Sequence, residues 1–186
     1  MSIVGAFMVP HPPLIVPAVG RGDEKGISAT IAAYQEVARR VAQLQPDTIV
    51  LTSPHTTLYL DYFHVSPGAA AGGSFAQFSA PQEKMTCTYD QEFTGTLETL
   101  ADQAKLPAGT RGERDPQLDH ATMVPLYFVN QVYKNYKLVR IGLSGLSLQK
   151  HYQLGQLIAA AAVKLNRRVV FIASGDLSHK LKRSGA

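Results

Sequence analysis

Three histidines in this chain follow apolar segments that have the character of buried strands. They are His11 after residues 2–9, His55 after residues 47–53 and His179 after residues 168–174. A neutral imidazole is a ligand for transition metals, and its ordinary pKa of about 6.5 also lets it exchange protons near neutral pH. The carboxyl ends of parallel strands meet at one edge of a sheet, where open α/β sheets bind ligands. We therefore expect these histidines to converge on one site.

His120 occupies a different position, at the predicted start of a helix in the segment LDHATMVPL. Asp119 precedes it as a candidate N-cap, and the partial positive charge of a helix N-terminus favours a neutral imidazole. Four prolines restrict the backbone beside the first two histidines: Pro10, Pro12, Pro13 and Pro54. Rigid presentation suits a metal ligand, because coordination tolerates little positional slack. Four histidines at element ends therefore favour one shared site over separate structural roles.

Other patterns have simpler interpretations. His64 lies in the short apolar segment YFHVS and is interpreted as a strand residue, whereas His151 lies among polar residues on a predicted helix. The glycines near residue 20 do not have the GxGxxG spacing, and the chain contains neither a Walker sequence nor a GxSxG elbow. Nucleotide binding through these motifs and serine hydrolase chemistry are therefore disfavoured.

The apolar pattern predicts four core strands and three amphipathic helices. The strands cover residues 2–9, 47–53, 137–144 and 168–174, and the helices cover residues 27–45, 90–105 and 147–165. Asp90 and Ser147 are candidate N-caps of the last two helices. Strands that alternate with helices predict an α/β fold with a largely parallel or mixed central sheet and helices on both faces. The segments YFHVS and SFAQF are expected to form two short strands around PGAAAGG.

Composition narrows the classes of partner. The net charge is +4 and the basic residues are scattered, so a nucleic-acid partner is not expected. No stretch approaches the about 20 apolar residues of a membrane span, and no membrane partner is expected. Cys87 is the single cysteine, which favours a reducing compartment and a cytoplasmic location.

Four segments carry a family resemblance, in the order VPHPP, PDTIVLTSPH, DHATMVPL and SGDLSH. Together they resemble the class III extradiol ring-cleavage dioxygenases. More specifically, they resemble the LigB-type domain of Memo-like and AmmeMemoRadiSam-system proteins. The resemblance extends over nearly the whole chain. It implies one LigB-type catalytic-like domain over residues 1–186, which we expect to be incomplete at its carboxyl end.

The resemblance also implies a role for each of the four histidines. In the family, the residues that match His11 and His55 bind non-haem Fe(II). The residue that matches His179 acts as acid or base, and the one that matches His120 orients the substrate or forms a hydrogen bond with it. The implied function is that of a metal-dependent oxygenase acting on a small, catechol-like aromatic substrate.

One part of the family pattern is missing from these residues. The third metal ligand of the family is a glutamate that comes after the segment matching SGDLSH, and Glu113 is the last glutamate of this chain. Asp176 is the last acidic residue, and its position in the pattern suggests support of the loop rather than metal binding. We therefore expect weak metal binding and little ring cleavage from residues 1–186 alone.

Two alternatives stay open at this point. The same histidines could hold Zn²⁺ in a hydrolase or lyase, with metal-bound water as the nucleophile. The chain could also be a non-catalytic Memo-type module that keeps the crevice without ring cleavage. A homo-oligomer is compatible with each of these readings.

Overall fold

The centre of the fold is a four-stranded sheet, seen in a computed structural model that describes residues 2–176. The sheet contains β1 (Ile3–Val9), β2 (Thr48–Ser53), β7 (Lys137–Gly142) and β8 (Val169–Ser174). The strand order is β1-β8-β2-β7, and all three pairings are parallel. The predicted parallel sheet is therefore confirmed, with each of its four strands within a few residues of the predicted bounds.

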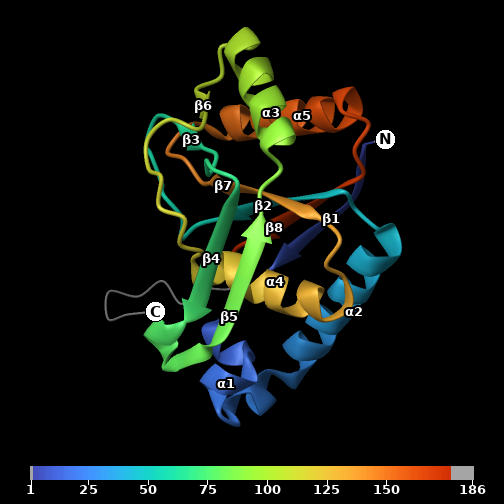
Figure 1. Ribbon diagram of the computed structural model, residues 1–186, viewed down its shortest axis with the longest axis vertical. Coiled ribbons are helices and arrows are strands. Elements are labelled where there is room, and N and C mark those ends of the chain that lie inside the picture. Colours follow the sequence, from blue (N-terminus) through green and yellow to red (C-terminus); the bar gives the residue numbers. More distant parts are fainter. Residues whose placement is uncertain (1, 177–186) are drawn as a thin grey trace.

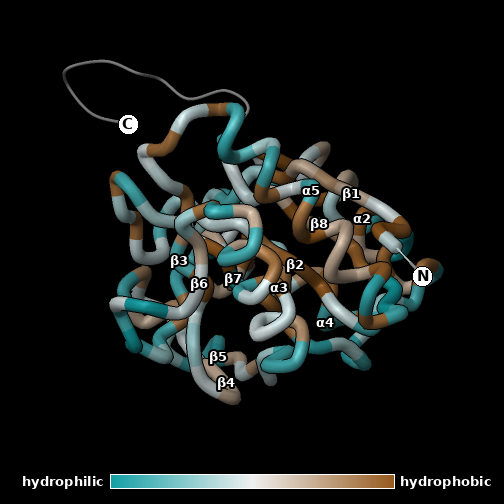
Figure 2. The backbone as a smooth tube through the Cα atoms, turned by 90° about the horizontal axis from the view of Figure 1, so that it is seen from above, coloured by the Kyte–Doolittle hydropathy of each residue, from teal (hydrophilic) through white to brown (hydrophobic). Residues whose placement is uncertain are grey.

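Helices cover both faces of this sheet (Figure 1). Helices α2 (Ser28–Leu44) and α4 (His120–Val132) pack together on one face, and α3 (Gln91–Gln103) and α5 (Leu148–Lys164) pack together on the other. Strand β2 contributes to both cores, because Ile49 and Leu51 face the first helix pair while Val50 faces the second. Figure 2 shows this central part of the chain in hydrophobic colours. The sheet is thus buried on both faces around β2, as a parallel α/β sheet requires.

The helix ends agree with the sequence at two of three predicted caps. The Asp90 carboxylate accepts a hydrogen bond of 3.1 Å from the backbone N–H of Phe93, and the Asp119 carboxylate accepts one of 2.9 Å from Thr122. Ser147 is the N-cap residue of α5, but its side chain makes no capping hydrogen bond. Helix α4 therefore begins at His120 because the Asp119 carboxylate satisfies one of its first free N–H groups.

The middle of the chain differs from the prediction. The short β3 (Phe63–His64) pairs in parallel with β6 (Ala108–Gly109), and a separate hairpin joins β4 (Ala70–Phe75) to β5 (Ala80–Thr88). Of the two short strands expected around PGAAAGG, the first is present as β3, but the second is misplaced, because β4 lies largely in the glycine-rich segment and Ala76–Phe78 form a 3-10 turn. A Cβ at Gly73 would lie 2.9 Å from the backbone oxygen of Leu118. Glycine is needed here so that β4 can approach the segment that leads into α4.

Short helical turns complete the described chain. They are α1 (Pro17–Gly20) and the 3-10 turns Pro13–Ile15, Asp23–Ile27 and Ala76–Phe78. Within residues 2–176, none of the helices has the length and apolar character needed to cross a membrane.

Candidate metal centre

The fold brings three of the four predicted histidines together. His11 lies just after β1, His55 just after β2, and His120 is the first residue of α4. The ring centroids are 5.0 Å apart for His11 and His55 and 4.3 Å apart for His55 and His120. Each ring offers a nitrogen, and these three nitrogens lie within 4.8 Å of one another. His179 lies outside the described residues, so its position stays a prediction.

His11 is held by the strand next to its own. Strands β1 and β8 pair in a register that places Val9 beside Ser174, the last residue of β8. The Ser174 hydroxyl lies 3.1 Å from Nδ1 of His11, whose residue is only 4% exposed. Nε2 of the same ring is 3.9 Å from Oδ1 of Asp176. A hydrogen bond at one ring nitrogen orients the other, which is how proteins commonly present a histidine to a metal.

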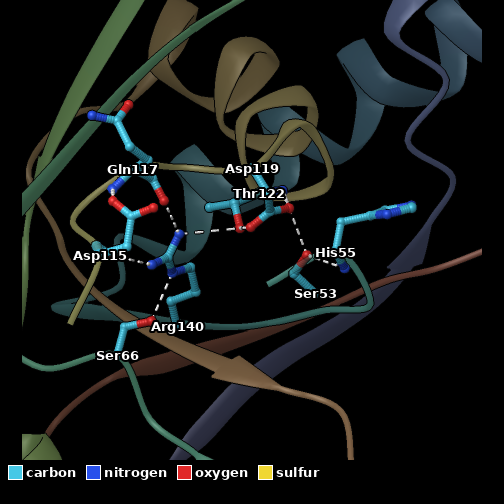
Figure 3. A network of polar contacts seen from close by, with 8 residues as sticks. All are labelled: Ser53, His55, Ser66, Asp115, Gln117, Asp119, Thr122 and Arg140. Carbon is cyan, nitrogen blue, oxygen red and sulfur yellow. Dashed lines mark hydrogen bonds and ion pairs between the residues drawn. The ribbon is translucent and has the colours of Figure 1, made fainter. Parts of the chain in front are cut away.

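His55 is fixed through its backbone. Its N–H donates a hydrogen bond of 3.1 Å to the hydroxyl oxygen of Ser53, the last residue of β2. The same hydroxyl donates a bond of 2.6 Å to Oδ1 of Asp119. Figure 3 shows the ring of His55 pointing away from this hydrogen-bonded loop. The polar contacts therefore hold the backbone and leave the imidazole available for another partner.

Asp119 lies at the junction of several contacts (Figure 3). Its Oδ2 accepts a hydrogen bond of 2.8 Å from the Thr122 hydroxyl and lies 3.6 Å from Nη1 of Arg140. Arg140 is a buried residue of β7, and it also donates bonds of 2.7 Å to the Ser66 hydroxyl and to the backbone oxygen of Gln117. The guanidinium is thus well satisfied despite its burial, which is the condition for a stable buried charge.

His120 is neutral at neutral pH. Burial is the largest cause that lowers its pKa to about 4, and the nearby His55 and His11 lower it further. The carboxylates of Asp119 and Asp176 oppose this shift only in part. The Phe78 ring packs against the His120 ring in an edge-to-face arrangement, with the two centroids 5.3 Å apart. The direction agrees with the expectation from the helix N-terminus, although burial is the first cause. A neutral imidazole has a free lone pair that can bind a metal or accept a proton.

A cavity of about 600 Å³ opens beside these histidines. Its wall includes His55, His120 and Asp119, together with Arg140 and Gln77. Pockets for small organic ligands have volumes of about 300–1,000 Å³. The cavity is therefore large enough for a single aromatic ring with substituents, next to two of the three imidazoles.

The donor set fits a transition-metal ion. Two nitrogens that bind one ion at about 2.1 Å each are separated by at most about 4.2 Å, so small side-chain movements close this cluster around an ion. Imidazole nitrogen is a suitable ligand for both iron and zinc. The three donors therefore do not by themselves distinguish these two metals.

Several residues of the site were not anticipated from the sequence. Ser53 and Ser174 are not among the predicted site residues, but they contact the two strand-end histidines. Arg140 was not predicted as part of the site, although an arginine flanked on both sides by apolar residues in the strand KLVRIGLS is an unusual feature. His64 does lie in a strand, and its Nε2 is 2.9 Å from the backbone oxygen of Glu113. His151 lies in α5 but is only partly exposed, since its ring packs on Phe63 at 4.7 Å.

Comparisons with known proteins place these residues in context. Residues 5–186 match the family described as the catalytic LigB subunit of aromatic ring-opening dioxygenase. The chain is 38% identical over 192 residues to a protein of Clostridium acetobutylicum, an alignment that covers 100% of this chain and 41% of that protein.

Two further relatives have informative names. The chain is 25% identical over 171 residues to the 3,4-dihydroxyphenylacetate 2,3-dioxygenase of Escherichia coli, covering 89% of this chain and 60% of the enzyme. It is 26% identical over 151 residues to a MEMO1 family protein of Methanocaldococcus jannaschii, covering 79% of this chain and 47% of that protein. The chain therefore spans between about two-fifths and three-fifths of the length of these curated relatives.

Proposed function

Because this chain belongs to the LigB family of aromatic ring-opening dioxygenases, we propose that it is a non-haem metal-dependent oxygenase domain acting on a catechol-like aromatic substrate. The observation that carries the proposal is the cluster of His11, His55 and His120 beside a cavity of about 600 Å³. The named dioxygenase among its relatives acts on a dihydroxylated aromatic compound, which supports the substrate class.

We assign the metal to His11 and His55, with Fe(II) as the proposed ion. When bound, such an ion supplies redox chemistry and open coordination positions for the hydroxyl oxygens of a catechol, which side chains alone do not provide. Ser174 and Ser53 orient the two ligands, each through a hydrogen-bond contact of 3.1 Å. The ends of β1 and β2, on either side of β8, would thus present both imidazoles to one ion.

His120 is proposed to act on the substrate. Because its pKa is lowered to about 4, one of its two ring nitrogens carries a free lone pair at neutral pH and can accept a hydrogen bond or a proton from a substrate hydroxyl. His179 is proposed as a further acid or base from its match to the family pattern. The polar wall of the cavity orients the substituents of the ring.

Metal binding provides the direct test. The purified chain is titrated anaerobically with Fe(II), beside a variant with His11→Ala and His55→Ala. We expect the double substitution to lower the affinity by at least about 100-fold, because each ligand and its orientation contribute strongly. Equal binding by both proteins would contradict the metal assignment. Oxygen consumption with catechols, followed by the absorbance of ring-opened products, tests the reaction itself.

A second candidate function is a Memo-type module that binds a metal without ring cleavage. The similarity to the MEMO1 family protein of M. jannaschii favours it. In the hydrolase or lyase alternative, the same histidines would hold Zn²⁺. Robust oxygen consumption over a panel of catechols would contradict this candidate, because little ring cleavage is expected from residues 1–186 alone.

The setting of the domain is proposed on the same basis. We place it in the cytoplasm, because the lone Cys87 suits a reducing compartment. A small aromatic molecule is the proposed partner. A homo-oligomer is tested by measuring the mass of the purified chain in solution.

A further inference from the structure

We propose that Asp119 is a positioning residue, which fixes His55 and His120 relative to each other through Ser53. This inference rests on the proposed function, since it concerns how the metal centre is assembled. It assigns no contact with substrate or metal to Asp119. Its role is to connect the end of β2 with the start of α4.

The connection is short and continuous. The His55 N–H donates to Oγ of Ser53 at 3.1 Å, and the Ser53 hydroxyl donates to Oδ1 of Asp119 at 2.6 Å. His120 is the next residue in the chain, and Asp119 caps the helix that His120 begins, through a bond of 2.9 Å from the Thr122 N–H. One carboxylate oxygen therefore joins the two elements that carry His55 and His120.

The second carboxylate oxygen is anchored from the other side. Oδ2 accepts the Thr122 hydroxyl at 2.8 Å and lies 3.6 Å from Nη1 of Arg140. That guanidinium is held by the Ser66 hydroxyl and by the Gln117 oxygen, both at 2.7 Å. The Asp119 carboxylate is only 12% exposed, so these contacts are shielded from water. Arg140 thus restrains the rotation of the carboxylate that links the two histidines.

A second copy of this arrangement lies at the opposite end of β2. The Thr48 hydroxyl donates to Oδ2 of Asp90 at 2.6 Å, and Asp90 caps α3 through the Phe93 N–H at 3.1 Å. Nε of Arg167 lies 3.7 Å from the same Oδ2. In both places a strand hydroxyl, an N-cap aspartate and an arginine join β2 to a helix.

The two copies differ in what they carry. Neither Thr48 nor Asp90 adjoins a histidine in the sequence, whereas Ser53 and Asp119 lie within two residues of His55 and His120 respectively. The Thr48 copy therefore joins a helix to the sheet and nothing more. It provides a control with the same donor, acceptor and helix-cap chemistry at a distance from the metal centre.

The experiment compares Ser53→Ala with Thr48→Ala in the full chain, using Co²⁺ alone as the probe. Both variants lose one buried hydroxyl donor to an N-cap aspartate, and Ser53→Ala also loses the acceptor of the His55 N–H, so we expect both to lower the midpoint of thermal unfolding. We expect Ser53→Ala alone to weaken Co²⁺ binding, by about 10-fold, because groups that orient metal ligands typically contribute 10–100-fold in affinity. The Co²⁺ absorption spectrum should change in the same variant, since it reports ligand geometry.

Two more variants separate positioning from general damage. Ser53→Thr retains the hydroxyl and should restore most of the affinity. Asp119→Asn retains an oxygen for the helix cap but presents an amide to Arg140, and it should weaken binding at least as much as Ser53→Ala. The imidazole resonances of His55 and His120 in the metal-free chain give a readout that needs no metal. They should shift in Ser53→Ala and stay unchanged in Thr48→Ala.

The outcomes are distinguishable. Equal loss of Co²⁺ affinity in Ser53→Ala and Thr48→Ala, or no loss in either, would overturn the positioning role while leaving the metal centre intact. Failure of the unaltered chain to bind Co²⁺ would overturn the proposed function, and the imidazole resonances would then decide the positioning role separately. Unchanged resonances in Ser53→Ala would reject it.

Discussion

His120 shares its surroundings with two other imidazoles, and this affects how the protein responds to acid. A proton on His120 is disfavoured by burial and by the neighbouring His55 and His11, which lower its pKa to about 4. Asp119 and Asp176 are the acidic groups that face it and favour the proton. In the unfolded chain the same imidazole takes up a proton at a pH of about 6.5.

We therefore expect the free energy of unfolding to fall as the pH decreases from about 6.5 to about 4, because the unfolded state binds more protons over this window. The contribution of the neutral His120 to the free energy of unfolding is fully present above pH about 6.5. Urea unfolding at several pH values measures the effect, and His120→Gln should give a shallower dependence. His64 also has a lowered pKa through burial and is unchanged in that variant, so the difference isolates His120. Titration of His120 at its ordinary pKa in an NMR experiment would contradict this expectation.

The residue scale also shows how far sequence reasoning reaches into a site. His11 and His55 could be found because each follows an apolar strand directly, and His120 because a capping aspartate precedes it. Arg140 and Ser66 could not be paired in this way, since 74 residues separate them and only the fold brings them to 2.7 Å. Residues that bind through side chains at element ends are visible in a sequence, whereas the groups that orient them depend on tertiary contacts.

At the scale of elements, the four core strands and three long helices follow from local patterns. Continuous apolar runs identify strands buried on both faces. Apolar residues repeated at the helical period identify the helix faces that pack against the sheet. Strand β4 could not be predicted, because glycine and alanine have low intrinsic strand preference and its conformation is set by close packing against Leu118. The same low strand preference explains why the strand expected at SFAQF was misplaced.

Gly142 allows a test of close packing at the end of β7. A Cβ at this position would lie 2.2 Å from the backbone oxygen of Thr57, two residues after His55. We expect Gly142→Ala to lower the free energy of unfolding by about 1–3 kcal/mol, since backbone has to move to admit a methyl group. The displaced loop should also weaken metal binding, as measured by Co²⁺ titration.

Gly155 provides the matched control within α5. A Cβ there would meet no atom within 4 Å, so Gly155→Ala should raise the free energy of unfolding by about 0.4–1 kcal/mol and leave Co²⁺ binding unchanged. Denaturant unfolding of both variants gives the comparison. A Gly142→Ala protein as stable as the unaltered chain would show that the His55 loop adapts more freely than this packing implies.

At the scale of the whole molecule, two hydrophobic cores share one sheet. Tyr34 and Leu126 belong to the core beneath α2 and α4, and Leu97 belongs to the core beneath α3 and α5. The alternating side chains of β2 enter both cores, so neither core can be lost while β2 keeps its buried faces. This arrangement predicts one cooperative unfolding transition for the described part of the chain, with the histidine cluster lost in the same step.

Two core variants test this coupling. Leu126→Ala and Leu97→Ala each remove a fully buried side chain from a different core, and each should lower the free energy of unfolding by about 2–5 kcal/mol. The chain has no tryptophan, so tyrosine fluorescence can be compared with far-UV circular dichroism. Five of the eight tyrosines lie in the first core or pack against it, so the tyrosine signal reports mainly that core, whereas the dichroism signal reports helices on both faces. The two probes should give coincident transitions in both variants. A separate early transition in Leu97→Ala that leaves the tyrosine signal unchanged would show that the two cores unfold independently.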